Sequence, residues 1–297
     1  MLEFRSITLG DRKRINEALA KSDFMGCEYS FANNLAWCRL ADSKICFYKD
    51  FYIVCAFGSE DNIPTFVLPS GSGDYCDVIA EMKKFSENFG FPLRISGVTD
   101  SSLDMLKQLY SYKFTYFLDR DSSDYIYLRS DLAELKGKKY HQKRNHLAKF
   151  NRIDSTFSFL SEKDFDDCIS FIVSDYNNKS ENDISHSAIA EQYAINTYFN
   201  HFEELGLSGG IIRINNKIAA VTIGEKINSD TFCVHIEKAD RSYDGIYTGI
   251  CNRFVNECTV GCTYINREED LGIEGLRKSK LSYHPIFLLN KYIVNFK

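Results

Sequence analysis

Acidic and basic side chains gather in one short stretch near the end of the chain, INREEDLGIEGLRKSKLSYHP, residues 265–285. Glu269 and Asp270 close an acidic run, and Arg277 and Lys280 follow after a glycine-containing turn. Carboxylates can accept a proton or bind an ammonium group, whereas Arg and Lys can bind a phosphate or stabilise an oxyanion. The stretch therefore predicts a site for a molecule that carries both kinds of charge.

The elements expected around this stretch would bring its charged groups together. The residues YIN are expected to end a strand, and a helix is expected to begin near Leu276. Open α/β sheets bind ligands at the carboxyl ends of strands, and the free N–H groups of a helix start favour an anion. Gly272 and Gly275 permit positive φ and a close backbone approach. One cleft in the second half of the chain should thus be lined by Glu269, Asp270, Arg277 and Lys280. A salt-bridge cluster that only caps the helix is the alternative.

A second charged segment, LKGKKYHQKRNHLAKFNR at residues 135–152, holds seven Lys or Arg residues and no acid. On a helix, Tyr140, Leu147 and Phe150 share one face, with Lys143 in its middle and Arg144 beside it. Both bases are expected to point inward, toward carboxylates or a ligand phosphate. The alternative is that the stem of Lys143 only covers apolar surface and that Arg144 makes a structural ion pair.

The third segment, HIEKADRSYDGIYTG at residues 235–249, is expected to lead from a strand through a loop into a helix. In acetyl-CoA-dependent acetyltransferases the corresponding loop binds pyrophosphate through backbone N–H groups. Asp244 would repel that pyrophosphate. Glu237 and Lys238, at the strand end, are open to two interpretations, a catalytic pair or an ordinary exposed pair.

Composition excludes several classes of protein. The 297 residues are 44% hydrophobic and 26% charged, with a net charge of −5 and a pI of about 5.8, which argues against a general nucleic-acid-binding surface. The 10 cysteines form no C-x-x-C pair, so we expect reduced thiols and no metal site. No apolar run is long enough to span a membrane and the N-terminus has no signal-peptide pattern. These features predict a cytoplasmic protein, compatible with peripheral contact at a membrane surface.

The order of expected elements indicates an α/β (α+β) protein in two parts. Strands and helices alternate in the first half. The second half follows the order helix, helix, hairpin, strand, helix, strand, which is typical of an acyltransferase-type domain. We therefore expect two tandem acetyltransferase-like (GNAT) domains with mixed sheets, residues 1–130 and 131–297, with the active site in the second.

Two long motifs, YIYLRSDLAELKGKKYHQKRNHLAKF and YINREEDLGIEGLRKSKLSYHP, with HIEKADRSYDGIY between them, resemble a known family. They look like the C-terminal catalytic domain of bacterial phosphatidylglycerol lysyltransferases, and most like its soluble, stand-alone relatives. That family is similar to Fem-type peptidoglycan aminoacyltransferases. Its motif positions correspond here to Lys143, Arg144, Asn145, Asp270, Gly272, Gly275, Leu276, Arg277, Lys280, Ser282, Tyr283 and Pro285.

The resemblance implies an aminoacyl or acyl transferase that moves an aminoacyl group from aminoacyl-tRNA to a hydroxyl or amine acceptor, with phosphatidylglycerol among the candidates. No cofactor is implied, because aminoacyl-tRNA is the donor co-substrate. The expected catalytic residues are Glu269, Asp270 and Lys280. The expected substrate-binding residues are Lys143, Arg144, Glu237, Arg277, Tyr283, Gly272 and Gly275.

Two other functions stay open. One is a coenzyme A-dependent N-acyltransferase, which Asp244 disfavours. The other is a non-catalytic protein that binds an RNA end or a charged small molecule. The multispan membrane domain of the lipid enzymes has no counterpart in this sequence, so another amine or hydroxyl acceptor, a lipid or a small molecule, is equally compatible with it.

Overall fold

A computed structural model describes residues 2–58, 61–111, 113–177 and 186–297. The chain divides into two compact units. Unit 1 contains residues 1–124, 269–273 and 288–297, and unit 2 contains residues 125–268 and 274–287. Among the helices of these described ranges, none is both long enough and apolar enough to cross a bilayer.

Unit 1 is an α/β unit with a mixed sheet. Its helices are α1 Arg12–Ser22, α2 Phe31–Trp37, α3 Tyr75–Glu87 and α4 Asp100–Tyr110, with short 3₁₀ turns at Leu9–Asp11 and Cys27–Tyr29. Its strands are β1 Ser43–Tyr48, β2 Phe51–Ala56, β3 Thr65–Val67, β4 Ser70–Gly71, β5 Arg94–Val98, the first part of β6 Phe114–Leu128 and most of β12 Phe287–Phe296. β3 and β5 pair in parallel, whereas β1, β2 and β12 pair antiparallel to their neighbours.

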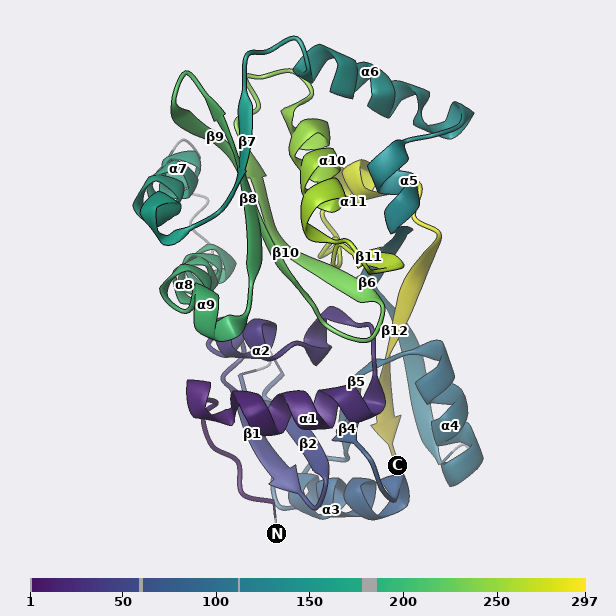
Figure 1. Ribbon diagram of the computed structural model, residues 1–297. Coiled ribbons are helices and arrows are strands. Elements are labelled where there is room, and N and C mark those ends of the chain that lie inside the picture. Colours follow the sequence, from purple (N-terminus) through teal and green to yellow (C-terminus); the bar gives the residue numbers. More distant parts are fainter. Residues whose placement is uncertain (1, 59–60, 112, 178–185) are drawn as a thin grey trace. The chain divides into compact units, whose positions relative to one another are not determined.

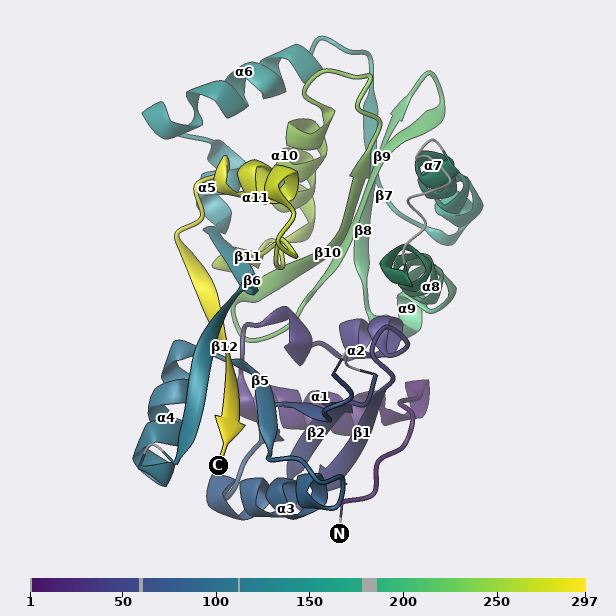
Figure 2. The same ribbon diagram turned by 180° about the vertical axis from the view of Figure 1, so that it is seen from behind.

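The core of unit 1 depends on the last strand of the chain. Val294 and Phe296 of β12 are buried together with α3 and α4 residues such as Met82 and Leu106. β12 pairs with β5 and lies between β5 and β6 (Figure 2). At the end of β12, the buried Val294 and Phe296 flank the less buried Asn295, because successive residues of a strand face opposite sides of the sheet.

Unit 2 is a second mixed α/β unit. Its helices are α5 Arg129–Glu134, α6 His141–Phe150, α7 Phe165–Asn177, α8 His186–Asn200, α9 Phe202–Leu205, α10 Ile246–Cys258 and α11 Glu274–Leu281, with 3₁₀ turns at Lys138–Tyr140 and Glu162–Asp164. Its strands are β7 Thr156–Phe159, β8 Ser208–Ile214, β9 Lys217–Lys226, β10 Thr231–Ala239, β11 Tyr264–Asn266 and the end of β6.

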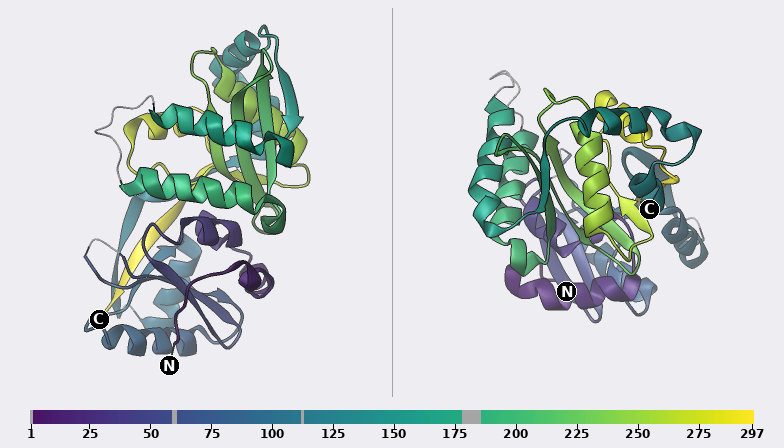
Figure 3. Two further views of the ribbon diagram at one scale, coloured as in Figure 1. Left: turned by 90° about the vertical axis from the view of Figure 1, so that its left-hand side faces the viewer. Right: turned by 45° about the horizontal axis from the view of Figure 1, so that its top comes forward.

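Helices cover both faces of the sheet of unit 2. The strand order is β6-β11-β10-β9-β8-β7, in which only β10 and β11 pair in parallel. α10 lies along one face of β8, β9 and β10, while α7 and α8 lie on the other face (Figure 1). α7 and α8 run side by side in the left view of Figure 3.

α6 carries the basic segment and packs by its apolar face. Phe150 is buried against Ile246 and Ile250 of α10, and Leu147 packs at the edge of the same cluster. Gly249 of α10 lies under Phe150, where a Cβ atom would be only 2.3 Å from the ring. The helical spacing read from the sequence therefore gives the correct buried face.

The expected α/β class with mixed sheets is confirmed. The expected division at residue 130 differs from the observed one in two ways. Unit 2 begins at Tyr125, and two C-terminal segments, residues 269–273 and 288–297, belong to unit 1. The reason is pairing: β12 bonds to β5, and the N–H of Leu271 bonds to the carbonyl of Asp121.

Candidate active site

A buried ion pair joins the ends of two neighbouring strands in unit 2. Glu237 lies near the end of β10, and Arg267 follows directly after β11, which pairs in parallel with β10. Arg267 donates from Nη2 to Oε1 of Glu237 at 2.7 Å, and the two side chains are only 12% and 11% exposed. Because parallel strands end at the same edge of a sheet, this is where α/β proteins commonly bind ligands.

Aromatic rings surround the cations of this site. The Lys143 ammonium lies 3.4 Å from the ring centre of Tyr283, and the Arg267 guanidinium carbon lies 4.7 Å from it. Such cation–π contacts stabilise a positive charge that has lost water. The Tyr283 carbonyl accepts a hydrogen bond from the buried hydroxyl of Tyr140 at 3.1 Å, and the Tyr283 hydroxyl lies 3.3 Å from Thr248 Oγ1.

Lys280 of α11 holds the backbone that carries Arg267. Its Nζ donates to the Arg267 carbonyl at 2.6 Å, and its own carbonyl accepts from the Tyr127 hydroxyl at 2.8 Å. Lys280 thus adds a positive charge and fixes the turn after β11. We call Lys143, Glu237, Arg267 and Lys280 the cationic cluster.

The cationic cluster changes the protonation of its members. Burial, and next the charge of Arg267, lowers the pKa of Lys143 to about 8. Burial raises the pKa of Glu237 above its usual value, although Arg267, Lys280 and Lys143 all oppose that rise. The four members carry more positive than negative charge, which favours an anionic ligand.

One donor of the cationic cluster is unused. Within the part of the chain that the structure describes, the buried Nη1 of Arg267 has no hydrogen-bond partner. Buried polar groups are nearly always satisfied, so an unused donor indicates a ligand group such as an oxyanion. Together, the cluster offers a proton acceptor, an unused donor and excess positive charge.

The expected cleft residues fall into different units. Glu269, Asp270 and Gly272 belong to unit 1, whereas Arg277 and Lys280 belong to unit 2. Their convergence on one cleft therefore stays a prediction.

Asp270 has a structural environment within unit 1. Its side chain is fully buried, accepts from Arg120 Nη1 at 3.1 Å and accepts from the N–H of Gly272 at 2.9 Å. Gly272 adopts a φ of 72°, as expected for a glycine in this turn.

Two expectations about individual residues need correction. Arg144 does not point inward: it is exposed, and its Nη1 donates to the carbonyls of Leu135 and Gly137 at 2.6 and 2.7 Å. These carbonyls follow the end of α5, where the helix leaves acceptors without partners. Gly275 lies within α11, which begins at Glu274, and not in a positive-φ turn. The positive φ values just before α11 belong instead to Glu268, Leu271 and Gly272.

The N-terminus of α10, the pyrophosphate position in acetyltransferases, is closed by α6. Asp244 pairs with Lys149 at 2.7 Å and lies 3.8 Å from His146. A Cβ atom on Gly245 would be 2.1 Å from the His146 carbonyl oxygen, so the backbones are in close contact. The position therefore differs from an open anion-binding loop, because an acidic side chain lies there and the α6 backbone leaves no room for a ligand.

Sequence reasoning missed Arg267, although it stands in the quoted REED run. Its neighbours in that run are acids, and the local pattern gave no reason to separate it from them. The available signal was its position directly after a strand, where a base can reach the end of the adjacent strand.

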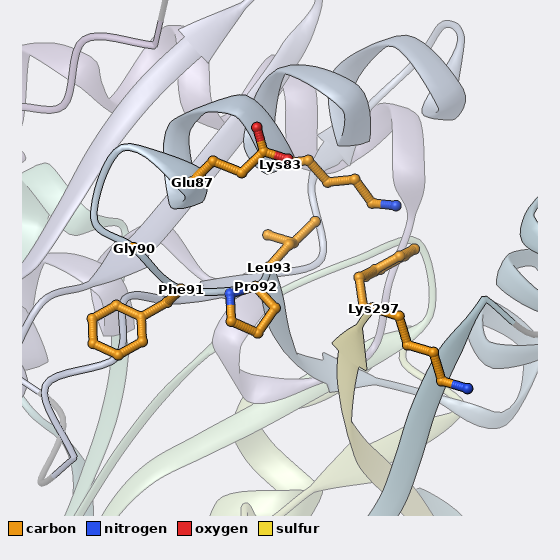
Figure 4. A pocket seen from close by; sticks show the side chains of 8 residues that line it. Lys83, Glu87, Gly90, Phe91, Pro92, Leu93 and Lys297 are labelled. Carbon is orange, nitrogen blue, oxygen red and sulfur yellow. The ribbon is translucent and has the colours of Figure 1, made fainter.

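A shallow pocket of about 300 Å³ lies in unit 1 at the end of α3 (Figure 4). Its lining residues are Lys83, Glu87, Gly90, Phe91, Pro92, Leu93, Phe296 and Lys297. None of them is an expected site residue, and Lys83 lies over the Phe296 ring at 4.2 Å. The carboxylate in its lining, Glu87, is exposed, whereas Glu237 is mostly buried.

Comparison with known proteins places the chain in a family. Residues 19–295 match the family described as "Phosphatidylglycerol lysyltransferase, C-terminal". The chain belongs to this phosphatidylglycerol lysyltransferase C-terminal family. The match spans both units, so both are part of the family's domain.

Solved structures agree with this family. A conserved protein of unknown function from Bacteroides thetaiotaomicron is 38% identical, with 100% of both chains covered and a TM-score of 0.93. The C-terminal domain of a putative lysylphosphatidylglycerol synthetase from Agrobacterium fabrum is 13% identical, covering 96% of this chain and 91% of that one, with a TM-score of 0.66. FemX is 10% identical, covering 99% and 97%, with a TM-score of 0.61. These likenesses show that the chain shares the overall fold of these proteins.

Proposed function

We propose that this protein transfers an aminoacyl group from an aminoacyl-tRNA to a hydroxyl or amine acceptor, phosphatidylglycerol among them. Family membership supports the reaction class. The observation that carries the proposal is the cationic cluster, with a buried carboxylate of raised pKa beside an unused Arg267 donor. An ester substrate needs no further activation, so alignment, proton removal and oxyanion stabilisation are sufficient.

In the proposed reaction, the acceptor oxygen or nitrogen attacks the ester carbonyl of the aminoacyl-tRNA. Glu237 takes the acceptor's proton, and Nη1 of Arg267 donates to the oxyanion that forms. The ester bond breaks, and the terminal ribose oxygen of the tRNA leaves with the proton that Glu237 took from the acceptor. Lys143 adds positive charge beside the reacting group, and Lys280 positions Arg267.

The assignment of roles differs from the sequence-based one. The proton acceptor proposed here is Glu237 in place of Glu269 or Asp270, because Asp270 is fully buried against Arg120. Glu269 is partly buried in unit 1, and its Oε2 lies 3.4 Å from the Cys27 thiol. Arg277 and Tyr283 stay proposed substrate-binding residues, with Tyr283 forming the aromatic wall of the cluster.

The test is incubation with charged tRNAs and candidate acceptors, followed by mass spectrometry of the products. We expect an aminoacylated acceptor from the native protein and at least a 10²-fold slower reaction with Glu237→Gln, the scale on which catalytic groups act. Lys149→Met, a change of an exposed base on α6, serves as the control. Tight tRNA binding with no turnover on any acceptor would favour the non-catalytic alternative instead.

A further inference from the structure

A second cluster of ligand-type side chains lies beside the cationic cluster in unit 2. Cys233 and His235 come from β10, and Glu268 comes directly after Arg267. Their ligand atoms, one thiol sulfur, one imidazole nitrogen and one carboxylate oxygen, all lie within 4.8 Å of one another. The proposed aminoacyl transfer uses none of these three side chains.

The backbone presents these groups in an unusual way. The pairing of β10 with β9 shifts between Val234 and Ile236, which leaves His235 as the extra residue of a β-bulge. Bulges redirect side chains and are common beside functional sites. Glu268 has a φ of 58°, a left-handed conformation that non-glycine residues rarely adopt. Both features aim their side chains at the same point.

The imidazole of His235 is held on both nitrogens and on one face. Nδ1 lies 2.9 Å from Glu268 Oε1, Nε2 lies 3.3 Å from Glu225 Oε1, and the Tyr198 ring stacks on the imidazole at 5.5 Å with an interplanar angle of 7°. The side chain is 0% exposed. Glu225 thus stands where metal-binding histidines usually donate their second N–H to a carboxylate.

We propose that Cys233, His235 and Glu268 bind a zinc-class divalent transition metal, with Glu225 as the carboxylate that orients His235. Thiolate, imidazole and carboxylate together are typical zinc ligands, and three protein ligands leave one position for water or substrate. In a tetrahedral zinc site, ligand atoms are about 3.3–3.7 Å apart. The sulfur of Cys233 lies 3.8 Å from Glu268 Oε1, so only small movements complete the geometry.

Metal binding should displace a proton from the protein. On binding, the divalent cation replaces the thiol proton of Cys233, which goes to solvent, and the sulfur binds as a thiolate. Metal sites commonly release protons in this manner.

A rival cluster in unit 1 is less suitable. Cys27, Asp124 and Glu269 also lie close together, but the Lys291 ammonium is 2.7 Å from Asp124 Oδ1 and 3.5 Å from Cys27 Sγ. A cation of the protein therefore occupies that position already. The sequence predicts no metal because it has no C-x-x-C pair, whereas the ligands in unit 2 come from two separate segments.

The test uses the full chain after treatment with a chelator. Titration with Co²⁺ should give a thiolate-to-cobalt charge-transfer band and tetrahedral d–d bands that saturate at one ion per chain. Calorimetric titration with Zn²⁺ in buffers of different ionisation enthalpy should show proton release on binding, because the Cys233 thiol loses its proton. A native protein without the charge-transfer band overturns the proposal, whatever the variants do.

Variants identify the ligands. Cys233→Ser should remove the charge-transfer band, and His235→Gln should weaken zinc binding by at least 10²-fold. Glu225→Gln should weaken it by about 10–100-fold, as expected for a residue that acts through a ligand. Cys27→Ser is the matched control and should keep the native cobalt spectrum. If the band survives Cys233→Ser and disappears in Cys27→Ser, the metal belongs to unit 1 and the proposal fails.

Discussion

The ammonium group of Lys143 and the ring of Tyr283 are in direct contact, 3.4 Å from nitrogen to ring centre. Tyr283 is buried, so this contact draws a Lys of a strongly basic helix out of water. The Arg267 guanidinium lies over the same ring, so two positive charges share one aromatic group. The positive charge of Arg267 favours the loss of a proton from Lys143, which is the more acidic of the two cations.

The pH dependence of activity should follow Lys143. The pKa of this side chain is about 8 in the folded protein and 10.5 in the unfolded chain. We expect the KM for the aminoacyl-tRNA to rise from about pH 7 to about pH 9, as the ammonium loses its charge. Lys143→Met should flatten this profile, whereas Lys149→Met should keep it. A native-like profile in Lys143→Met would exclude Lys143 as its source.

The stability of the protein should increase with pH, although the binding of aminoacyl-tRNA weakens with pH. Between about pH 8 and pH 10.5 the unfolded chain retains a proton on Lys143 that the folded protein has lost. The unfolded state then binds more protons, so the Lys143 contribution makes the free energy of unfolding increase with pH across this window. Urea unfolding of the native protein and of Lys143→Met at several pH values measures the difference. If the free energy of unfolding of the native protein falls with pH relative to that of Lys143→Met, the pKa of Lys143 is not lowered by folding.

Breaking the ion pair of Arg267 and Glu237 should be costly for folding. Arg267→Met leaves a buried carboxylate without its partner and should lower the free energy of unfolding by about 3–5 kcal/mol. The double variant Arg267→Met/Glu237→Leu should recover much of that loss, because no buried charge then stays unpaired. Both variants should lack transfer activity. If the double variant is no more stable than Arg267→Met, the two residues are not coupled.

Lys280 and Lys278 on α11 provide a matched pair for the site. Lys280 is partly buried and holds the Arg267 carbonyl, whereas Lys278 is exposed. Lys280→Met should slow transfer by about 10²-fold, as for the loss of one group that stabilises an oxyanion. Lys278→Met should transfer at the native rate, and thermal melts should show that both variants fold. Equal rates in the two variants would leave Lys280 with only the structural role of fixing the turn after β11.

Acetyl-CoA should not bind with useful affinity. The backbone of α6 and the ion pair of Asp244 with Lys149 close the N-terminus of α10. We expect calorimetry to detect no binding tighter than about 1 mM, which corresponds to about −4 kcal/mol. Asp244→Asn should not create a site, because the backbone contact at Gly245 persists. Micromolar affinity in the native protein would favour the coenzyme A-dependent alternative.

Asp270 should contribute to the stability of the protein and not to the transfer reaction. Its side chain is fully buried and bonds to Arg120 and to the backbone of Gly272. Asp270→Asn keeps the size but removes the charge, so we expect a loss of about 1–3 kcal/mol in the free energy of unfolding. Transfer per folded molecule should stay within a few-fold of the native rate. A stable variant with no activity would restore the sequence-based assignment of Asp270 as a catalytic residue.

The sequence-based predictions succeeded where a residue's environment depends on its near neighbours in the sequence, and failed where it depends on a separate element. Helical spacing placed Lys143 on the apolar face of α6, because Tyr140, Leu147 and Phe150 repeat within a few residues. The same reasoning failed for Arg144, whose partners are carbonyl groups after the end of another helix. Arg267 and Glu237 come together only because β10 and β11 pair. The residue pattern of one strand does not identify the strand with which it pairs.

The membership of β12 in unit 1 has a consequence for synthesis of the chain. Residues 288–297 supply Val294 and Phe296 to a core whose other members come mostly from residues 2–114. On the ribosome, residues 2–114 are therefore made before β12, and their hydrophobic core is incomplete until β12 follows. During translation of unit 2, the edge of β5 that β12 will cover stays exposed to other nascent chains. Synthesis of unit 1 therefore begins before that of unit 2, but its core is completed after the segments of unit 2 have been made.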